Sequence, residues 1–296
     1  MGDERISGMK PRVKDKYFIL LAAVLWSTAG LGVKLLSWNA FSISCVRGML
    51  CALVLLAIRF KDGNRTAPSL NRYNILAGLF MFATSSLYVL SIKLTTAANA
   101  IVLQYIAPIA VLLYNILMKQ RKPTRADIAL TAVVFGGCVL TFAGQLERGG
   151  MLGNALALLS GFMFAGQIIV NNKRQTNQQD GLLIGCALSF VVYLPFVFFD
   201  AGFTLTPVNI MAGLFLGLVQ YGIANLCFAR GIRTTDAVTA SLLLTIEPVL
   251  SPVWVMLTIR EVPAGYAIAG FICVIAAVTA HNIYPLIRFG KNGNTS

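Results

Sequence analysis

Long apolar runs occupy most of this chain and constrain its fold more than any other feature. A helix needs about 20 apolar residues to cross roughly 30 Å of hydrocarbon, and ten runs come close to that length. They span residues 17–36, 41–60, 72–92, 96–118, 127–144, 151–171, 181–199, 208–230, 235–258 and 263–287. The short connections leave no room for a soluble catalytic or nucleic-acid-binding domain. We therefore predict an all-α polytopic membrane bundle of ten transmembrane helices.

The composition agrees with this prediction. Of the 296 residues, 57% are hydrophobic and 12% are charged, and the mean hydropathy of +0.75 lies far from that of soluble domains. Basic residues precede the first run, as they do in a signal peptide. That run is long enough to span a membrane and lacks a small-x-small cleavage site, so we expect it to form the first helix.

Lys and Arg residues are divided unevenly between the connections. If the spans alternate in direction, 19 of the 24 fall on the side of the N-terminus, four fall on the other side, and Arg47 lies within the second run. Cytoplasmic connections of membrane proteins are rich in Lys and Arg, so we predict cytoplasmic termini in a bacterial-type inner membrane. The same bias explains the net charge of +13 without a nucleic-acid partner.

The sequence predicts neither a metal site nor a cofactor. Its six cysteines lie in apolar runs and form no CxxC pair, which favours packing roles over a disulfide frame or a zinc site. No GxxxxGK[ST] loop is present, so ATP is not expected to drive the protein. The runs also lack paired aspartates and a GxSG motif with a facing histidine, so we expect no enzyme.

One segment of the chain repeats. The stretch TTAANAIVLQYIAP (95–108) aligns with TDAVTASLLLTIEP (235–248) at an offset of 140 residues. The repeat predicts two five-helix halves at 17–145 and 150–288, flanked by a basic segment 1–16 and a tail 289–296. Because five is odd, the halves are expected to be inverted relative to one another. Inverted repeats are typical of alternating-access transporters, although gene duplication also builds inert scaffolds and channels.

Four stretches carry a resemblance to a known family. LLAAVLWSTAGLGVKLL (20–36), SISCVRGML (42–50), QYIAP (104–108) and LLLTIEPVLSPVW (242–254) resemble the ten-helix EamA-type members of the drug/metabolite transporter superfamily. The likeness spans the whole chain in helix count, repeat and topology. It implies transport of small metabolites, and many family members resemble amino-acid or drug exporters.

Glu247 is the most unusual residue of the apolar runs. It lies about twelve residues into the run 235–258, near the bilayer midplane, where an ionised carboxylate in lipid would be costly. It must therefore face the bundle or a water-filled cavity. Two roles stay open: coupling or binding of a substrate ammonium, and a structural partnership with a hydroxyl or with Arg47.

Two prolines are expected to kink the helices that carry the repeat. Pro108 and Pro248 occupy equivalent positions and cannot donate an amide hydrogen bond, so carbonyls one turn earlier are left free. Arg47 lies close enough to the outer surface for its side chain to snorkel or to meet a carboxyl group, and we expect a structural or gating role for it.

Aromatic and amide side chains at helical spacing suggest a cavity for a small amphipathic solute. The candidate substrate-binding residues are Trp26, Tyr88, Gln104, Tyr105, Gln167, Tyr221, Asn225 and Trp254. Each polar member could instead form a hydrogen bond between helices.

The sequence thus predicts a secondary active transporter for a small amphipathic metabolite, an amino acid or a related amine, working by alternating access. The resemblance implies export, while the sequence itself leaves import open, and it leaves proton coupling through Glu247, exchange and facilitated transport as alternatives. The alternatives are a flippase for a lipid or lipid-linked sugar and a transporter of cationic drugs or quaternary amines. The expected partners are a small-molecule substrate and the lipid bilayer, and glycine-rich helix faces favour packing within a monomer or weak dimer.

Overall fold

The computed structural model describes residues 13–61, 67–118, 124–142 and 150–259, together with 265–266, 268–270, 272–274 and 276–277. Helices and short connections make up these ranges, and they contain no β-strand. Most of the N-terminal segment 1–16, the end of the tenth run and the tail 289–296 lie outside the described residues.

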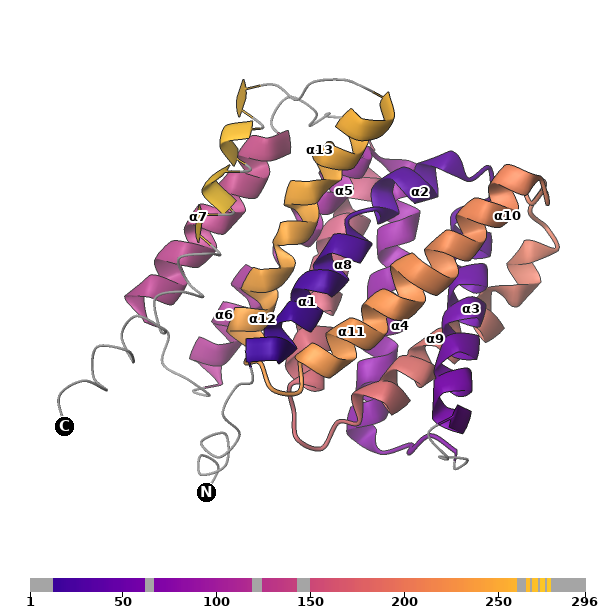
Figure 1. The fold of residues 1–296 in the computed structure, drawn as a ribbon, viewed down its shortest axis with the longest axis horizontal. Coiled ribbons are helices and arrows are strands. Elements are labelled where there is room, and N and C mark those ends of the chain that lie inside the picture. Colours follow the sequence, from indigo (N-terminus) through magenta and orange to yellow (C-terminus); the bar gives the residue numbers. More distant parts are fainter. Residues whose placement is uncertain are drawn as a thin grey trace.

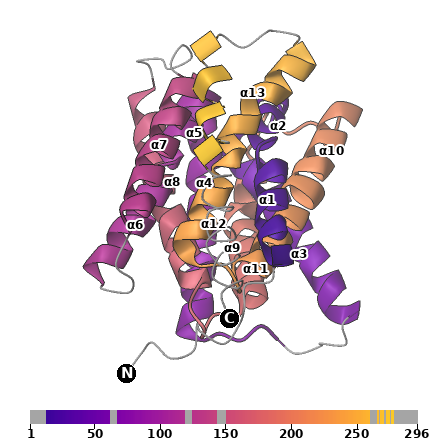
Figure 2. The same cartoon turned by 60° about the vertical axis from the view of Figure 1, so that its left-hand side comes forward.

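The helices form one bundle (Figure 1), with α7 at one flank and α3 and α10 at the other in both ribbon views (Figure 2). Their bounds are α1 Val13–Trp26, α2 Ala29–Leu35, α3 Ala40–Lys61, α4 Arg72–Leu94, α5 Ala97–Gln104, α6 Ala107–Leu117, α7 Arg125–Phe142, α8 Met151–Asn171, α9 Gln178–Val197, α10 Pro207–Leu214, the π-helix η2 Phe215–Ile223, α11 Ala224–Gly231, α12 Ala237–Leu244 and α13 Ile246–Ile259.

Seven helical stretches are long and apolar enough to cross a bilayer. They are Asp15–Leu35, Ala40–Lys61, Arg72–Leu94, Asn99–Leu117, Met151–Asn171, Gln178–Val197 and Pro207–Gly231, and a shorter apolar stretch covers Ala237–Ser251. α7 occupies the fifth predicted run, and the described pieces between 265 and 277 are helical within the tenth. The prediction of an all-helical, multi-pass bundle is therefore confirmed.

The outer faces of the spans remain apolar. Leu79, Phe162 and Val191, each within a spanning helix, are 45%, 48% and 65% exposed. Soluble domains rarely expose contiguous apolar surface of this kind, whereas lipid chains cover it at no cost. Contact with lipid thus explains why apolar residues lie on the outward-facing sides of these helices as well as on their buried sides.

The packing of the helices follows the internal repeat. By position in the repeat, α1, α3 and α4 of the first half correspond to α8, α9 and the span α10–η2–α11 of the second half. The contact of α4 with α8 thus corresponds to that of α11 with α1, and the contact of α4 with α9 corresponds to that of η2 with α3. The corresponding helices α3 and α9 pack on each other. The bundle therefore has a pseudo-two-fold axis that passes between α3 and α9.

The two halves run in opposite directions. Asn154, at the start of α8, accepts a hydrogen bond of 2.8 Å from Thr95, at the end of α4. Asn172, just after α8, donates to the carbonyl of Ile232, next to the hydroxyl of Thr234, which donates to Asp15 near the start of α1. α8 therefore ends where α1 begins. We call these two ends of the bundle the α8 end and the α1 end, after the helix that starts there.

Two spans are interrupted at equivalent places. α5 ends at Gln104 and α12 at Leu244, 140 residues later, and a new helix follows each after one or two residues. Proline clashes with the carbonyl four residues before it. That residue is Gln104 for Pro108 and Leu244 for Pro248, so each break lies one turn before its proline rather than at it.

Close helix approach requires glycine at the junction of α4 and α9. A Cβ atom on Gly78 would lie 2.7 Å from Cγ2 of Ile184, and one on Gly181 would lie 2.8 Å from Cβ of Ala77. Small residues let helix backbones approach where no hydrophobic force between helices operates in lipid. This junction holds the α1 end of the bundle together.

Candidate functional site

A cavity of about 460 Å³ lies at the centre of the bundle, between the two halves. Its walls come from α1, α2, α3, α4, α5, α8, η2, α11 and α13. The lining residues are Trp26, Ala29, Arg47, Met81, Thr84, Ser85, Tyr88, Gln104, Phe164, Gln167, Gln220, Tyr221, Asn225 and Glu247. Arg47 and Glu247 are the charged members of this set, so the cavity offers one charge of each sign.

Most of the residues predicted from helical spacing meet at this cavity. The structure places Trp26, Arg47, Tyr88, Gln104, Gln167, Tyr221, Asn225 and Glu247 in its wall. Tyr105, Trp254 and the two prolines are not among the lining residues. Within the described residues, no group of three His, Cys, Asp or Glu side chains gathers to hold a metal.

Glu247 meets the opposite half of the protein through Tyr105. The hydroxyl of Tyr105 lies 2.8 Å from Oε2 of Glu247 and 2.7 Å from the carbonyl oxygen of Leu244. Leu244 is the last residue of α12, whose carbonyl Pro248 leaves without a helical partner. The breaks of the two inverted spans are thus joined through one phenol.

The Tyr105 hydroxyl has one proton to serve two acceptors. When Glu247 is ionised, that proton can go to the carboxylate and leave the Leu244 carbonyl without it. When Glu247 is protonated, the carboxylic acid can donate to the phenol oxygen while the phenol donates to Leu244. The protonation of Glu247 therefore selects the hydrogen-bond pattern at the α12–α13 break.

Arg47 is buried rather than directed to the membrane surface. Its side chain is 4% exposed, its Nη2 donates to Oε1 of Gln220 at 2.9 Å, and its guanidinium lies 4.4 Å from the ring centre of Tyr221. Snorkelling is thus wrong for this residue. No ion pair joins Arg47 to Glu247 in the part of the chain that the structure covers.

The π-helix η2 explains why two consecutive residues reach the same arginine. Gln220 and Tyr221 both belong to η2, and both line the cavity. Wider π-type turns often occur at functional sites, and they bring neighbouring side chains closer to one face than an α-helix does. Sequence spacing identified Tyr221 but missed Gln220, because α-helical periodicity points consecutive residues about 100° apart.

Aromatic rings form one wall of the cavity. The ring of Trp26 packs edge-on against Phe164, with centroids 5.9 Å apart, and at 5.4 Å from Phe228. Trp254 donates its Nε1 proton to Oγ of Ser27 at 2.6 Å, beside the junction of α1 and α2. Trp26 therefore contributes an apolar surface to the cavity, while Trp254 holds the helix that carries it.

The amide side chains differ in how far they are engaged. Nε2 of Gln104 donates to Oγ of Ser160, and Nδ2 of Asn225 donates to the carbonyl of Tyr221. The side-chain amide of Gln167 has no hydrogen-bond partner among the described residues. Gln104 thus joins helices as well as lining the cavity, whereas Gln167 is available to a solute.

A smaller cavity of about 210 Å³ continues from the central one toward the α1 end. The two share Met81, Gln167 and Asn225, and the smaller one extends to Asn171 and Gln178 at the junction of α8 and α9. Nε2 of Gln178 donates to the carbonyl of Asn171 at 2.8 Å. This junction separates the cavities from the surface at that end.

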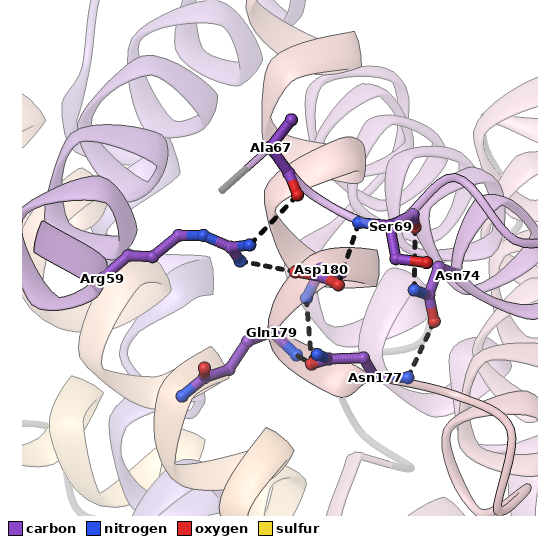
Figure 3. A network of polar contacts seen from close by, with 7 residues as sticks. All are labelled: Arg59, Ala67, Ser69, Asn74, Asn177, Gln179 and Asp180. Carbon is purple, nitrogen blue, oxygen red and sulfur yellow. Dashed lines mark hydrogen bonds and ion pairs between the residues drawn. The ribbon is translucent and has the colours of Figure 1, made fainter. Parts of the chain in front are cut away.

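A polar network closes the α1 end (Figure 3). Asp180, in the first turn of α9, forms an ion pair with Arg59 at the end of α3 and accepts from the amide of Ser69 at 3.0 Å. The Asn74 side chain donates to the carbonyl of Ser69 and accepts from the amide of Asn177 at 2.7 Å. The α8–α9 connection is thereby tied to the residues that precede α4.

The opposite end is closed by the symmetry-related connections. In the α2–α3 connection, the amide of Asn39 donates to Asp200 at 2.9 Å, and the Ser37 hydroxyl donates to the carbonyl of Gly202 at 2.8 Å. The indole of Trp38 donates to the carbonyl of Thr204 at 3.0 Å. Equivalent connections are therefore hydrogen-bonded at both ends of the bundle, and the Arg59–Asp180 ion pair lies at the α1 end.

A comparison with known families decides the identity of the fold. The EamA-like transporter family matches the chain twice, over residues 16–143 and 151–282. The protein belongs to the EamA-like transporter family. The two matches coincide with the two inverted sets of helices. The membership also means that the chain is a transporter rather than an enzyme.

Characterised and uncharacterised EamA-like relatives share most of the chain. An uncharacterized transporter of Archaeoglobus fulgidus is 23% identical over 280 residues, which cover 90% of this chain and 96% of the relative. The threonine/homoserine exporter RhtA of Salmonella typhimurium (strain SL1344) is 22% identical over 246 residues, covering 81% and 80%. The uncharacterized inner membrane transporter YicL of Salmonella typhimurium (strain LT2) is 24% identical over 251 residues, covering 79% and 83%.

A solved crystal structure of a protein without a stated function has the same fold. It superposes with a TM-score of 0.76 at 18% identity and covers 92% of this chain and 98% of the solved one. At this identity the likeness concerns the arrangement of helices alone. The arrangement of helices described above is therefore found in an experimental structure as well.

Proposed function

We propose that this EamA-like protein is a secondary carrier that moves a small amphipathic solute, an amino acid or a related amine, by alternating access. The observation that carries the proposal is the central cavity. It lies between two inverted halves and is lined by both, and equivalent connections are hydrogen-bonded at the two ends of the bundle. In a protein with two inverted halves, each half can adopt the conformation of the other. The inward-open and outward-open states can therefore be built from the same kinds of helix contact.

The wall of the cavity favours a solute with an apolar part and a polar head. The rings of Trp26 and Phe164 offer an apolar surface, and Gln167, Arg47 and Glu247 offer polar groups. Sites for small molecules combine apolar walls with a few placed polar groups in this way.

Proton coupling is the driving mechanism that we propose. Glu247 lines the cavity and shares the Tyr105 proton with the carbonyl at the α12–α13 break. Loading Glu247 with a proton thus alters the hydrogen bonding of a helix break that both halves contact. A buried ionisable group inside a membrane bundle commonly marks such a pathway.

The relatives support the cellular setting of the proposal. RhtA is named as a threonine/homoserine exporter and YicL as an inner membrane transporter. We accordingly propose an inner-membrane location and export of solute, and from the uneven distribution of Lys and Arg we propose cytoplasmic termini. A cationic amine remains the second candidate substrate, because Glu247 supplies a carboxylate that a cation can approach. A lipid flippase is less well supported, because Arg47 is the one cationic side chain among the described lining residues and both halves contribute to the cavity wall.

The test is transport in proteoliposomes containing the purified full chain. Entry of radiolabelled L-threonine, L-homoserine, L-leucine or L-phenylalanine, and of the matching amines, is measured by counterflow and with an imposed pH gradient. We expect saturable counterflow of at least one solute, accelerated by the gradient in one direction. Absence of counterflow for every amino acid and every amine, in vesicles that hold folded protein, would contradict the proposal.

A further inference from the structure

We propose that Arg47 anchors the carboxylate of a zwitterionic substrate, with Glu247 facing its ammonium group. The inference rests on the proposed carrier function and narrows its substrate class. It predicts that α-amino acids with a free carboxylate are carried in preference to amines or to amino-acid amides of the same size.

Arg47 carries hydrogen-bonding capacity that the protein does not use. Its Nη2 is engaged by Gln220, whereas Nε and Nη1 have no hydrogen-bond partner in the described structure. Both nitrogens are shielded from water, and the side chain as a whole is 4% exposed. Burying a guanidinium group without hydrogen-bond partners costs free energy. An anion that reaches Arg47 therefore gains a charge-assisted hydrogen bond without competing with water.

The surroundings of Arg47 fix its orientation without neutralising it. Gln220 accepts one bond, and the Tyr221 ring lies under the guanidinium at 4.4 Å, so both neighbours hold the plane while leaving the charge intact. The hydroxyl of Thr84, in the same wall, is also buried without a hydrogen-bond partner. The planar guanidinium of Arg47 matches the two oxygens of a carboxylate, and Thr84 offers a further hydroxyl in the same cavity.

Glu247 is the second charged group of the cavity and is opposite in sign to Arg47. Glu247 is bonded to Tyr105 rather than to Arg47, and no ion pair joins the two in the described residues. Tyr88 lines the same cavity as both groups. A solute with one charge of each sign satisfies both groups, whereas an amine leaves Arg47 unpaired and an anion leaves Glu247 unpaired.

The aromatic wall defines where the rest of the solute lies. Trp26 and Phe164 occupy the same cavity as the charged pair and pack edge-on against each other. An amino acid whose ammonium and carboxylate face the two charged groups can place its side chain against these rings. The cavity therefore has separate surfaces for the head and for the side chain of the substrate.

The first experiment needs no mutation. Purified native protein in detergent is titrated with L-threonine, L-leucine and L-phenylalanine, and with the α-amide of each, by isothermal calorimetry and by competition in counterflow. Each amide keeps the ammonium and the side chain but lacks the carboxylate. We expect at least a tenfold weaker interaction for each amide whose parent acid binds.

The second experiment removes the anchor. Arg47→Gln should abolish the preference for the acid over its amide, with the amide affinity changed by less than threefold, and Arg47→Lys should restore part of the preference by keeping the charge. The matched control is Arg72→Gln. Arg72 also lies over a tyrosine ring, that of Tyr73 at 4.8 Å, but on the exposed surface, so its loss should leave the preference intact.

The outcomes separate the inference from the proposed function. Native protein that carries acid and amide equally well, or a preference that survives Arg47→Gln, overturns the carboxylate site while leaving the carrier in place. Native protein that binds and carries neither acids, amides nor amines overturns both. If Arg47→Gln does not fold, the comparison of acid and amide on native protein decides alone.

Discussion

At the scale of single residues, Tyr105 and Glu247 control the contact between the two helix breaks. The phenol reaches a carboxylate and a carbonyl that lie three positions apart in the second half of the chain. Neither acceptor is satisfied within its own helix, because Pro248 releases the carbonyl of Leu244 and burial deprives Glu247 of water. The Tyr105 side chain of the first half thus supplies a hydrogen-bond donor to the helix break in the second half.

Replacing Glu247 by Gln tests coupling at this contact. The amide keeps the shape and can still accept from Tyr105, but it cannot bind or release a proton. We expect Glu247→Gln to lose acceleration of transport by a pH gradient and to weaken counterflow without abolishing it, because the amide oxygen can still accept a hydrogen bond from the substrate ammonium. The readout is gradient-driven uptake alongside counterflow in the same vesicles.

The control for that variant is Asp127→Asn, which neutralises a buried carboxylate at the start of α7, away from the cavity lining. It should keep both activities. Equal loss of gradient-driven uptake, counterflow and folded protein in Glu247→Gln would instead show that the carboxylate serves structure.

Replacing Tyr105 by Phe removes the shared proton. Buried acceptors left without a donor cost about 1–3 kcal/mol, so the free energy of unfolding should fall by that amount. Thermal denaturation in detergent measures the change, with Tyr73→Phe on the exposed start of α4 as the control. Stability equal to that of native protein would show that the phenol adds nothing to the two breaks.

At the scale of elements, the connections between helices form a polar network at each end of the bundle. The Arg59–Asp180 ion pair joins α3 to α9, and Asp180 also holds the amide of Ser69 before α4. Partly buried ion pairs embedded in a hydrogen-bond network are coupled rather than additive. The α1 end should therefore open as a unit when this network breaks.

Substituting Asp180 by Ala should open the α1 end. We expect at least a threefold faster reaction of a cysteine placed at Asn171, in the smaller cavity, with a membrane-impermeant maleimide, in a background with the native cysteines replaced by alanine. Arg59→Ala should act similarly, and the double variant should add little, with a coupling energy of about 0.5–3 kcal/mol in a double-mutant cycle. Unchanged labelling in all three variants would argue against a closure at this network.

At the scale of the whole molecule, the inverted repeat makes the two ends equivalent in construction. Residues 36–39 meet 200–204 at the α8 end, and the α8–α9 connection meets the residues before α4 at the α1 end. Alternating access requires that each closure can open while the other holds. Locking one closure should therefore stop turnover without unfolding the protein.

A disulfide at the α8 end tests this requirement. The hydroxyls of Ser37 and Thr204 lie 3.5 Å apart, so the paired substitutions Ser37→Cys and Thr204→Cys should form a disulfide on oxidation. We expect oxidation to reduce counterflow by the double variant at least tenfold and dithiothreitol to restore it. Counterflow by each single variant should be unchanged by either treatment. Full counterflow in the oxidised double variant would mean that this end need not open.

Much of the architecture follows from the sequence. The apolar runs set the spans, and the offset of 140 residues between 95–108 and 235–248 anticipated both the inverted halves and the equivalent breaks. Helical periodicity also grouped Gln167, Tyr221 and Asn225 on faces that the structure turns toward one cavity. These features are local: run length, residue spacing and proline chemistry depend on neighbours in the chain.

The tertiary structure alone decided how the polar groups pair. Tyr105 and Glu247 are 142 residues apart, and Arg47 and Gln220 are 173 apart. No spacing rule relates such positions, because their contact depends on how helices from opposite halves pack. The π-turns of η2 are likewise invisible to α-helical periodicity. The sequence by itself determined which residues enter the bundle and where its helices break, whereas packing across the pseudo-two-fold axis determined which charges stay unpaired and face the cavity.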